Sequence, residues 1–259
     1  MLVLLPPSEG KTTPSRGPRL EIASLSFPDL NPAREEIVRQ LISWSTDSPK
    51  DVQRALGLSD RQLGEVERNQ ALATSPCAPA AGVYTGVLYE ALSWPTTTAA
   101  QRRRGQRRLA ISSALFGLLR PLDLIPAYRL SAGTRMPDLP GLASIWQDGI
   151  ANICTTLRRN QIIVDLRSAA YVKLAPIPPT LSERTVSVRV LAQRGKKRVV
   201  VSHHNKATKG QLARDLIDID IPRSTQELAQ ALNTIGYTVE LTPPAKAGPS
   251  WGLDIITRE

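Results

Sequence analysis

The sequence predicts an α/β fold, a single compact mixed-sheet domain with surrounding helices. Two continuous apolar runs, Met1 to Leu5 and Ile162 to Leu166, are typical of strands buried on both faces. Amphipathic segments with helix start signals lie between these runs. The chain has 259 residues, 41% of them hydrophobic, which is enough for a large core. Because no linker, repeat or low-complexity segment interrupts the pattern, we expect residues 1–259 to form a single domain.

Helices are expected to dominate the first 75 residues after the first strand. Prolines and glycine at positions 14–18 exclude a helix there, so residues 8–12 are predicted to form a loop that leaves a strand end. Helix start signals follow at Asn31, Ser48 and Ser59, and proline comes directly after the first two.

The middle of the chain predicts a broken helix, a strand and a hairpin. Residues 81–92 look helical but are interrupted by glycines, and residues 109–112 form another short apolar run. Residues 185–193 alternate between apolar and polar side chains, which is typical of a half-exposed strand. Residues 194–197 then form a turn, and residues 198–203 return as the hairpin partner.

The last part of the chain predicts two helices and two strands. A loop at residues 204–206 is expected to lead into a helix that continues to about Ile217. Ser224 and Glu227 form a capping box at the start of the next helix. The closing strands are predicted at residues 237–241 and 253–257.

Positive charge is concentrated in two stretches. The chain carries 33 basic and 23 acidic side chains, a formal net charge of +10. Residues 102–135 hold eight arginines and one acid, and residues 184–214 hold nine basic residues and no acid. Such a field attracts polyanions such as nucleic acid, nucleotides or phosphorylated metabolites. For the arginine run 102–108, a plain solvated surface is an equally good interpretation.

Several common chemistries are excluded by the motifs. Gly10, Lys11 and Thr12 follow a strand, but Leu5 stands where a phosphate loop needs glycine, and the prolines prevent the helix that must follow. No G-x-S-x-G nucleophile elbow occurs. Two cysteines, at 77 and 154, suit neither a disulfide framework nor a zinc site, so we expect no metal and no cofactor.

The chain shows no sign of a membrane or export signal. No apolar run approaches the roughly 18 residues that a membrane span needs. The N-terminal apolar stretch lacks the basic start and the small-residue cleavage site of a signal peptide. We therefore expect a cytoplasmic protein that does not bind a membrane.

Polar side chains inside apolar runs and at strand ends are candidates for a site. Unpaired charges are costly in apolar surroundings, so these groups should pair with each other or meet a ligand. Carboxylates could act as base or orienter, and tyrosines as proton donors. A structural ion pair between Asp123 and Arg120, and half-buried core tyrosines, are the open alternatives. The catalytic candidates are Asp123, Asp165, Tyr128, Tyr171 and Lys173.

Lysines at strand ends and at a helix start are candidates for holding an anion. Only eight of the 33 basic residues are lysine, so a lysine in such a place suggests a need for a compact or titratable cation. His203 and His204 are adjacent on a predicted strand, so they should point to opposite faces and cannot share one metal. The candidates for binding an anion or nucleic acid are Lys11, Arg120, Arg129, Ser168, Lys196, Lys197, Arg198, His203, Asn205, Lys206 and Lys209.

A collinear series of motifs resembles the YaaA family, the peroxide stress proteins long described as a domain of unknown function. The motifs are MLVLLPPSEGK, VYTGVLYEAL, SALFGLLRPLDLIPAYRL, IIVDLRSAAYVKL and VVSHHNKATKGQLARDLI. The resemblance implies a compact mixed α/β fold with a basic cleft, a helix-hairpin-helix element and binding to double-stranded DNA. It also implies a role in limiting iron-dependent damage during hydrogen peroxide stress. Residues 117–124 are the candidate hairpin, and a plain buried turn is the equal alternative.

Two functions and one structural alternative follow from these residues. The protein could hold double-stranded DNA through backbone phosphates, with salt-sensitive affinity and no base reading. It could instead be an enzyme on a nucleotide, phosphorylated metabolite or nucleic-acid lesion, and the sequence leaves this open. A third interpretation is that the embedded groups form satisfied core networks. Both functional interpretations predict that Lys11, Arg120, Asp165 and Lys206 converge on one receptor for a negatively charged partner.

Overall fold

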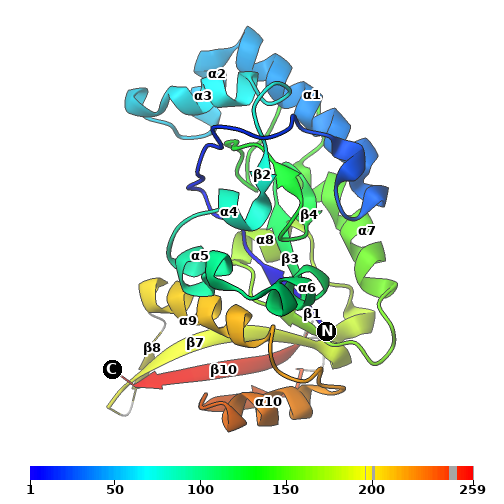
Figure 1. The fold of residues 1–259 in the computed structure, drawn as a ribbon, viewed down its shortest axis with the longest axis vertical. Coiled ribbons are helices and arrows are strands. Elements are labelled where there is room, and N and C mark those ends of the chain that lie inside the picture. The colour runs from blue at the N-terminus through cyan, green and yellow to red at the C-terminus, as the bar shows by residue number, and fades with distance from the viewer. Residues whose placement is uncertain (196, 200–201, 245–249, 259) are drawn as a thin grey trace.

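A computed structural model describes residues 1–195, 197–199, 202–244 and 250–258. Within these residues, a mixed eight-stranded sheet runs through the molecule with helices packed on both of its faces (Figure 1). The sheet follows the order β4-β3-β1-β6-β7-β10-β9, and β8 pairs with β7. This architecture confirms the predicted α/β fold with a mixed sheet.

Strand β1 (Leu2–Leu5) lies inside the sheet, between β3 (Leu109–Ser113) and β6 (Ile163–Asp165). It is parallel to both neighbours and fully buried, as its apolar run predicts. The chain therefore pairs β3 with one edge of β1 and, later in the sequence, β6 with the other edge. Ligand sites of open α/β sheets commonly lie at the carboxyl ends of strands at such a switch point.

The other strands extend the sheet on both sides. β7 (Thr185–Arg194) is parallel to β6 and to β10 (Trp251–Arg258), whereas β9 (Val239–Thr242) is antiparallel to β10. The remaining strands are β4 (Gly117–Leu119) on β3, β8 (Lys197–Val199) on β7, and a separate antiparallel pair of β2 (Ala78–Pro79) with β5 (Leu124–Ile125).

The predicted N-terminal helices are confirmed. α1 (Asn31–Asp47), α2 (Pro49–Ala55) and α3 (Gly64–Gln70) lie together at the top of Figure 1. The predicted helix at residues 81–92 is divided into α4 (Ala80–Val83) and α5 (Val87–Leu92), and Gly86, at φ 93°, lies in the break. The other helices are α6 (Ala99–Arg108), α7 (Leu142–Thr155), α8 (Ala169–Leu174), α9 (Ser202–Asp215) and α10 (Thr225–Thr234), with short 3-10 helices at Ile22–Ser24, Pro28–Leu30, Asp60–Gln62, Trp94–Thr96 and Pro179–Arg184.

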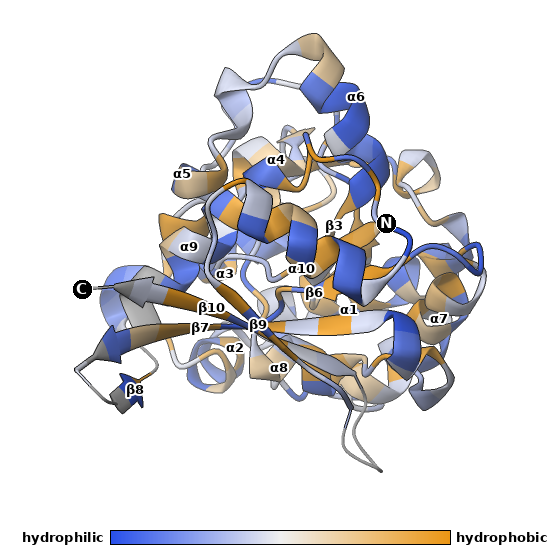
Figure 2. Cartoon of the chain, turned by 90° about the horizontal axis from the view of Figure 1, so that it is seen from below, coloured by the Kyte–Doolittle hydropathy of each residue, from blue (hydrophilic) through white to orange (hydrophobic). Residues whose placement is uncertain are grey.

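Helices α9 and α10 cover opposite faces of the C-terminal part of the sheet (Figures 1 and 2). α10 begins at the predicted cap, where the Ser224 side chain accepts from the Glu227 N–H, and it buries Leu228 and Leu232. Figure 2 shows hydrophobic residues along β10, whereas α6 is mostly hydrophilic. Among the described residues, none of the helices combines the length and the apolar character that crossing a membrane requires.

Two local predictions are wrong. Residues 202–206 belong to α9 and not to a strand end and loop, because the helix begins at Ser202 and continues to Asp215. Its apolar residues Leu212 and Ala213 are fully buried, and packing of this helix overrides the strand-like run before it. Residues 117–124 hold β4, a turn and the start of β5, all in extended backbone or turn, so this segment is not a helix-hairpin-helix.

Candidate functional site

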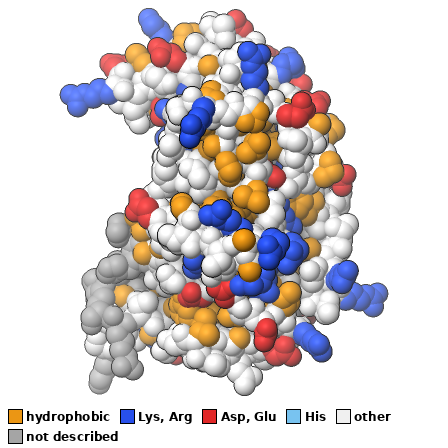
Figure 3. Space-filling model, in the orientation of Figure 1, with side chains coloured by type: hydrophobic (Ala, Val, Ile, Leu, Met, Phe, Trp, Pro, Cys, Tyr) orange, Lys and Arg blue, Asp and Glu red, His pale blue; other side chains and the backbone are white. Residues whose placement is uncertain are grey.

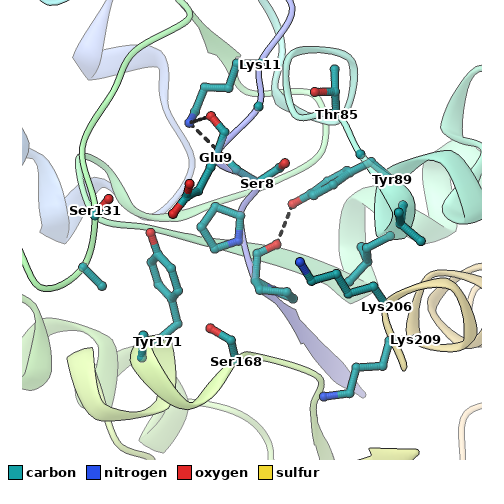
Figure 4. Close-up of a pocket in the computed structure, with 18 of the residues that line it drawn as sticks. Ser8, Glu9, Lys11, Thr85, Tyr89, Ser131, Ser168, Tyr171, Lys206 and Lys209 are labelled. Carbon is teal, nitrogen blue, oxygen red and sulfur yellow. Dashed lines mark hydrogen bonds between the residues drawn. The ribbon is translucent and has the colours of Figure 1, made fainter. Parts of the chain in front are cut away.

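A cavity of about 680 Å³ opens at the carboxyl ends of β1 and β6. Residues 6–11, which follow β1, form one wall, and Leu166 and Ser168, which follow β6, form another. The segment 128–133 and the helices α5, α8 and α9 complete the lining (Figure 4). We call it the strand-end cavity, and it lies where the strand order predicts a ligand site.

Backbone contacts hold these walls together. The Leu166 N–H donates to the Leu4 carbonyl at 2.9 Å, which continues the pairing of β6 with β1 to the cavity edge. The Tyr89 hydroxyl donates to the Pro6 carbonyl at 2.7 Å and fixes the start of the loop after β1. Helix α9 packs closely on α5, because a Cβ on Gly210 would lie 2.1 Å from the Leu88 carbonyl oxygen.

Lys11 is a half-buried amine in the cavity wall. Its Nζ donates to the Ser8 carbonyl at 2.8 Å and to the Glu9 carbonyl at 3.3 Å. The same nitrogen lies 4.3 Å from the centre of the Tyr128 ring and 5.4 Å from that of Tyr84. An isolated backbone bridge between Lys11 and Tyr84 ties the loop to the end of α4.

Burial shifts the titration of this lysine. Loss of solvent, and next the positive charge of Arg129, lower the pKa of Lys11 from 10.5 to about 7. Glu65 and Glu9 oppose this change, and Arg68 adds to it. The amino group therefore exists in both charged and neutral forms near neutral pH. Because only the charged form attracts an anion, Lys11 should bind anions more weakly than the sequence analysis predicts.

A chain of hydroxyl groups lies behind Lys11. The Tyr128 hydroxyl is 2.7 Å from Ser113 Oγ and 2.8 Å from the Tyr84 hydroxyl. Ser113 ends β3, and its Oγ also accepts from the Phe116 N–H at 2.9 Å. Burial raises the pKa of Tyr84 and of Tyr128, so both phenols keep their protons.

Helices α8 and α9 present polar side chains to the cavity from opposite sides. Tyr171 and Lys206 point toward the space between the two helices in Figure 4, and Lys206 is exposed. Lys209 lies deeper and donates to the Leu166 carbonyl at 3.2 Å. Burial lowers the pKa of Lys209, and the charge of Asp165 opposes that shift. Burial also raises the pKa of Tyr171.

Arg129 joins the loop after β1 to the segment 128–133. Its guanidinium pairs with Glu9 at 3.0 Å, and its side chain is 15% exposed whereas that of Glu9 is 76% exposed. Asn69 holds the Arg129 backbone through two hydrogen bonds of 2.8 Å. Arg129 Nε and Asn205 Oδ1 are buried polar atoms that find no hydrogen-bond partner among the described residues. Both residues line the cavity, so a polar ligand could satisfy them.

A family comparison adds the decisive observation. The sequence model of the family described as peroxide stress protein YaaA matches residues 1–242. This chain belongs to the YaaA family. The match confirms the resemblance that the sequence motifs indicate.

Proteins named UPF0246 proteins are similar to this chain over most of their length. One from Streptomyces coelicolor is 42% identical over 260 residues, 100% of this chain and 99% of its own. One from Corynebacterium efficiens is 40% identical over 251 residues, 95% and 97% of the two chains. One from Marinomonas sp. is 29% identical over 238 residues, 88% of each chain.

The candidates divide into two groups in this YaaA-family structure. The group that lines the strand-end cavity consists of Lys11, Tyr128, Arg129, Ser168, Tyr171, Asn205, Lys206 and Lys209. Asp165 lies outside it and pairs with Arg167 through contacts of 2.9 and 2.7 Å. Arg167 is fully buried and also donates to the Ala175 carbonyl, so this pair holds β6 to the end of α8.

Arg120 and Asp123 lie away from the cavity. The Asp123 carboxylate accepts from the Ser26 hydroxyl at 2.7 Å and from the Arg120 N–H at 2.8 Å. The Arg120 guanidinium donates to the carbonyls of Arg107 and Leu109. Arg120 lines a separate space of about 500 Å³ with Arg107 and Arg158, which we call the arginine recess. The predicted convergence therefore includes Lys11 and Lys206 but not Arg120 or Asp165.

The remaining candidates lie elsewhere or outside the description. Lys173 is exposed on α8 and does not line the cavity. Arg198 pairs with Glu240 at 2.7 Å on the surface. Lys196 lies outside the described residues, and for Lys197 and His203 the structure describes the backbone alone.

The sequence analysis did not select two residues whose side chains hold parts of the cavity lining in place. Ser113 ends strand β3, so the strand-end position that singled out Asp165 could also have indicated it. Tyr89 lies on α5 and holds the Pro6 carbonyl, a contact between distant segments that no local pattern predicts.

Proposed function

We propose that this YaaA-family protein binds a phosphate-bearing nucleotide unit in the strand-end cavity as part of a peroxide stress response. The unit could be a free nucleotide or one residue of a DNA strand. The observation that carries the proposal is the convergence of Arg129, Lys206 and Lys209 in one cavity where Glu9 is the acidic lining residue. Its volume falls in the range of about 300–1,000 Å³ that is common for small-molecule sites.

The form of the lining supports a nucleotide more than a bare anion. Lys206 and Lys209 match a phosphate group, with Arg129 held beside them by Glu9. Hydroxyls and amides such as Ser168 and Asn205 match a sugar or a base edge. Tyr171 offers an aromatic face for stacking.

Two of the five arginines of α6 are held within the protein, which favours the cavity over a surface coat on DNA. Lys and Arg side chains gather over α6 on the face in Figure 3. Yet Arg108 donates to the carbonyls of Leu216, Ile217 and Ile219, and Arg104 pairs with Asp218. These guanidiniums hold α6 to the segment after α9, which leaves them less free to hold phosphates.

Calorimetric titration with a nucleoside 5′-monophosphate and with the matching nucleoside tests the proposal. We expect the monophosphate to bind at least tenfold more tightly, and Lys206→Ala and Lys209→Ala each to weaken it about tenfold, or about 1.4 kcal/mol. Arg103→Ala, at an exposed position of α6, is the matched charge control and should leave the affinity unchanged.

The same variants with a short DNA duplex separate the two functions. A duplex affinity that falls with the cavity variants supports a nucleotide of DNA as the ligand. If Arg103→Ala weakens the duplex and the cavity variants do not, the protein coats DNA through α6 and the cavity proposal is wrong.

A further inference from the structure

The amino group of Lys11 has a geometry that phosphate binding does not require. A neutral primary amine has two N–H donors and one lone pair. The carbonyls of Ser8 and Glu9 offer two acceptors at 2.8 and 3.3 Å, so both protons can be held by the protein and the lone pair remains available. The faces of Tyr128 and Tyr84 shield the nitrogen on another side.

We propose that Lys11 forms an imine with the aldehyde of a phosphorylated sugar held in the strand-end cavity. The ligand class is an aldose 5-phosphate unit in its open-chain form, either free or at an abasic position of DNA. This inference rests on the proposed function, because Lys206 and Lys209 would hold the phosphate while Lys11 meets the aldehyde.

The step balances without an oxidant, reductant or metal. The Nζ lone pair bonds to the aldehyde carbon, and the C=O π electrons move to the oxygen, which takes a proton. That oxygen leaves as water when the C=N bond forms, and the two protons of the water derive from the two N–H bonds of the amine. Tyr171 keeps its phenol proton because burial raises its pKa, so it can donate to the departing oxygen.

The surroundings of Lys11 keep the amine reactive near neutral pH. Arg129 and Arg68 disfavour its charged form, and Glu65 and Glu9 favour it. Burial outweighs these charges and lowers the pKa of Lys11 to about 7. A lysine in such surroundings is the usual form of a nucleophilic amine in proteins.

Reductive trapping tests the proposal on the intact protein. The protein is incubated with 2-deoxyribose 5-phosphate and sodium cyanoborohydride, and the modified lysine is located by peptide mass spectrometry. We expect one adduct at Lys11, formed at least tenfold faster than at the exposed Lys50. Lys11→Arg should abolish it, and Lys50→Arg, the matched control, should not. Adducts spread over exposed lysines at equal rates would overturn the proposal.

A second measurement needs no variant. The rate of trapping at Lys11, divided by that of N-α-acetyl-lysine in the same solution, should fall as pH rises from about 7 to about 10. Lys11 is already largely neutral in that range, whereas the free lysine side chain has a pKa of about 10.4. Equal pH profiles for Lys11 and N-α-acetyl-lysine would overturn the proposal even if Lys11→Arg fails to fold.

Two controls distinguish failure of the imine proposal from failure of the proposed function. If the nucleoside monophosphate binds in calorimetry but Lys11 is not trapped, the imine is wrong and the nucleotide site stands. If phosphate-free deoxyribose labels Lys11 as fast as the phosphorylated sugar does, the phosphate role is wrong and the amine chemistry stands. A duplex with an abasic site, compared with the free sugar phosphate, shows which source reacts faster.

Discussion

At the residue scale, the titration of Lys11 connects the cavity to the stability of the protein. Its pKa is lowered from 10.5 to about 7, so between these pH values the unfolded chain binds a proton that the folded chain does not. The free energy of unfolding therefore rises as pH increases from 7 to 10.5, and Lys11 destabilises the fold most below pH 7.

Lys11→Met should consequently stabilise the protein at neutral pH. Each unit of pKa shift corresponds to about 1.4 kcal/mol. Part of the gain is lost because the carbonyls of Ser8 and Glu9 lose their donor. We expect a net increase in the free energy of unfolding of about 1–3 kcal/mol at pH 7. By about pH 10.5 we expect a net loss, because the gain from the pKa shift has vanished and the missing hydrogen bonds remain. Urea unfolding at several pH values measures it, and a loss of stability at pH 7 would show that charged Lys11 supports the fold.

Removing one partner of the buried pair of Asp165 and Arg167 should destabilise the protein, in contrast to Lys11→Met. Asp165→Asn leaves the fully buried guanidinium uncompensated, so we expect a loss of about 3–5 kcal/mol in the free energy of unfolding. Arg189→Ala, at a pair whose arginine is 64% exposed, is the matched control and should cost under about 1 kcal/mol. Asp165→Asn that keeps wild-type stability but loses ligand binding would instead place Asp165 in the site.

The sequence identified the polar positions better than their roles. Lys11, which follows β1, lines the cavity together with Lys206 and Lys209 of α9, because the carboxyl ends of neighbouring parallel strands meet at one edge and α9 lies beside it. Lys173, which the sequence analysis also selected, does not line it. Arg120 and Asp165 looked equally suitable, but each has a partner within a few residues along the chain or across the sheet. Distances across the fold decide which charges are neutralised, and one sequence does not contain them.

At the scale of elements, the contact between α5 and α9 positions the lysines of the cavity. Gly210→Ala would bring a Cβ within 2.1 Å of the Leu88 carbonyl oxygen, so the two backbones must separate. We expect a loss of about 2 kcal/mol in stability and a weaker affinity for the monophosphate, because Lys206 and Lys209 move with α9. Thermal unfolding and calorimetry measure the two effects.

Gly64→Ala is the matched control for this glycine. A Cβ at Gly64, the first residue of α3, meets nothing within 4 Å. Stability should therefore stay equal or rise by up to about 1 kcal/mol. If Gly210→Ala behaves like Gly64→Ala, the close packing of α5 and α9 is wrong.

Most elements could be predicted because their signals are local. The apolar run of β1 and the cap of α10 depend on neighbouring residues alone. The start of α9 could not, because residues 198–203 have a strand-like pattern that only the packing of the helix overrides. The same limit applies to residues 117–124, where glycine and proline signal a turn but not the strands that flank it.

At the scale of the whole molecule, the salt dependence of DNA binding reports how many phosphates the protein contacts. A site for one nucleotide unit should meet about two or three phosphates, giving a slope of log affinity against log salt near −2 to −3. A coat over the basic surface would meet about 6–10 phosphates and show a slope several-fold steeper. Fluorescence anisotropy with a short duplex over a salt series distinguishes the two.

The most direct test is a crystal structure of the protein with a nucleoside 5′-monophosphate. We expect density for the nucleotide in the strand-end cavity, with its phosphate in contact with Lys206 and Lys209. Density for the phosphate in the arginine recess of Arg107, Arg120 and Arg158, with the cavity holding no nucleotide, would contradict the proposed site.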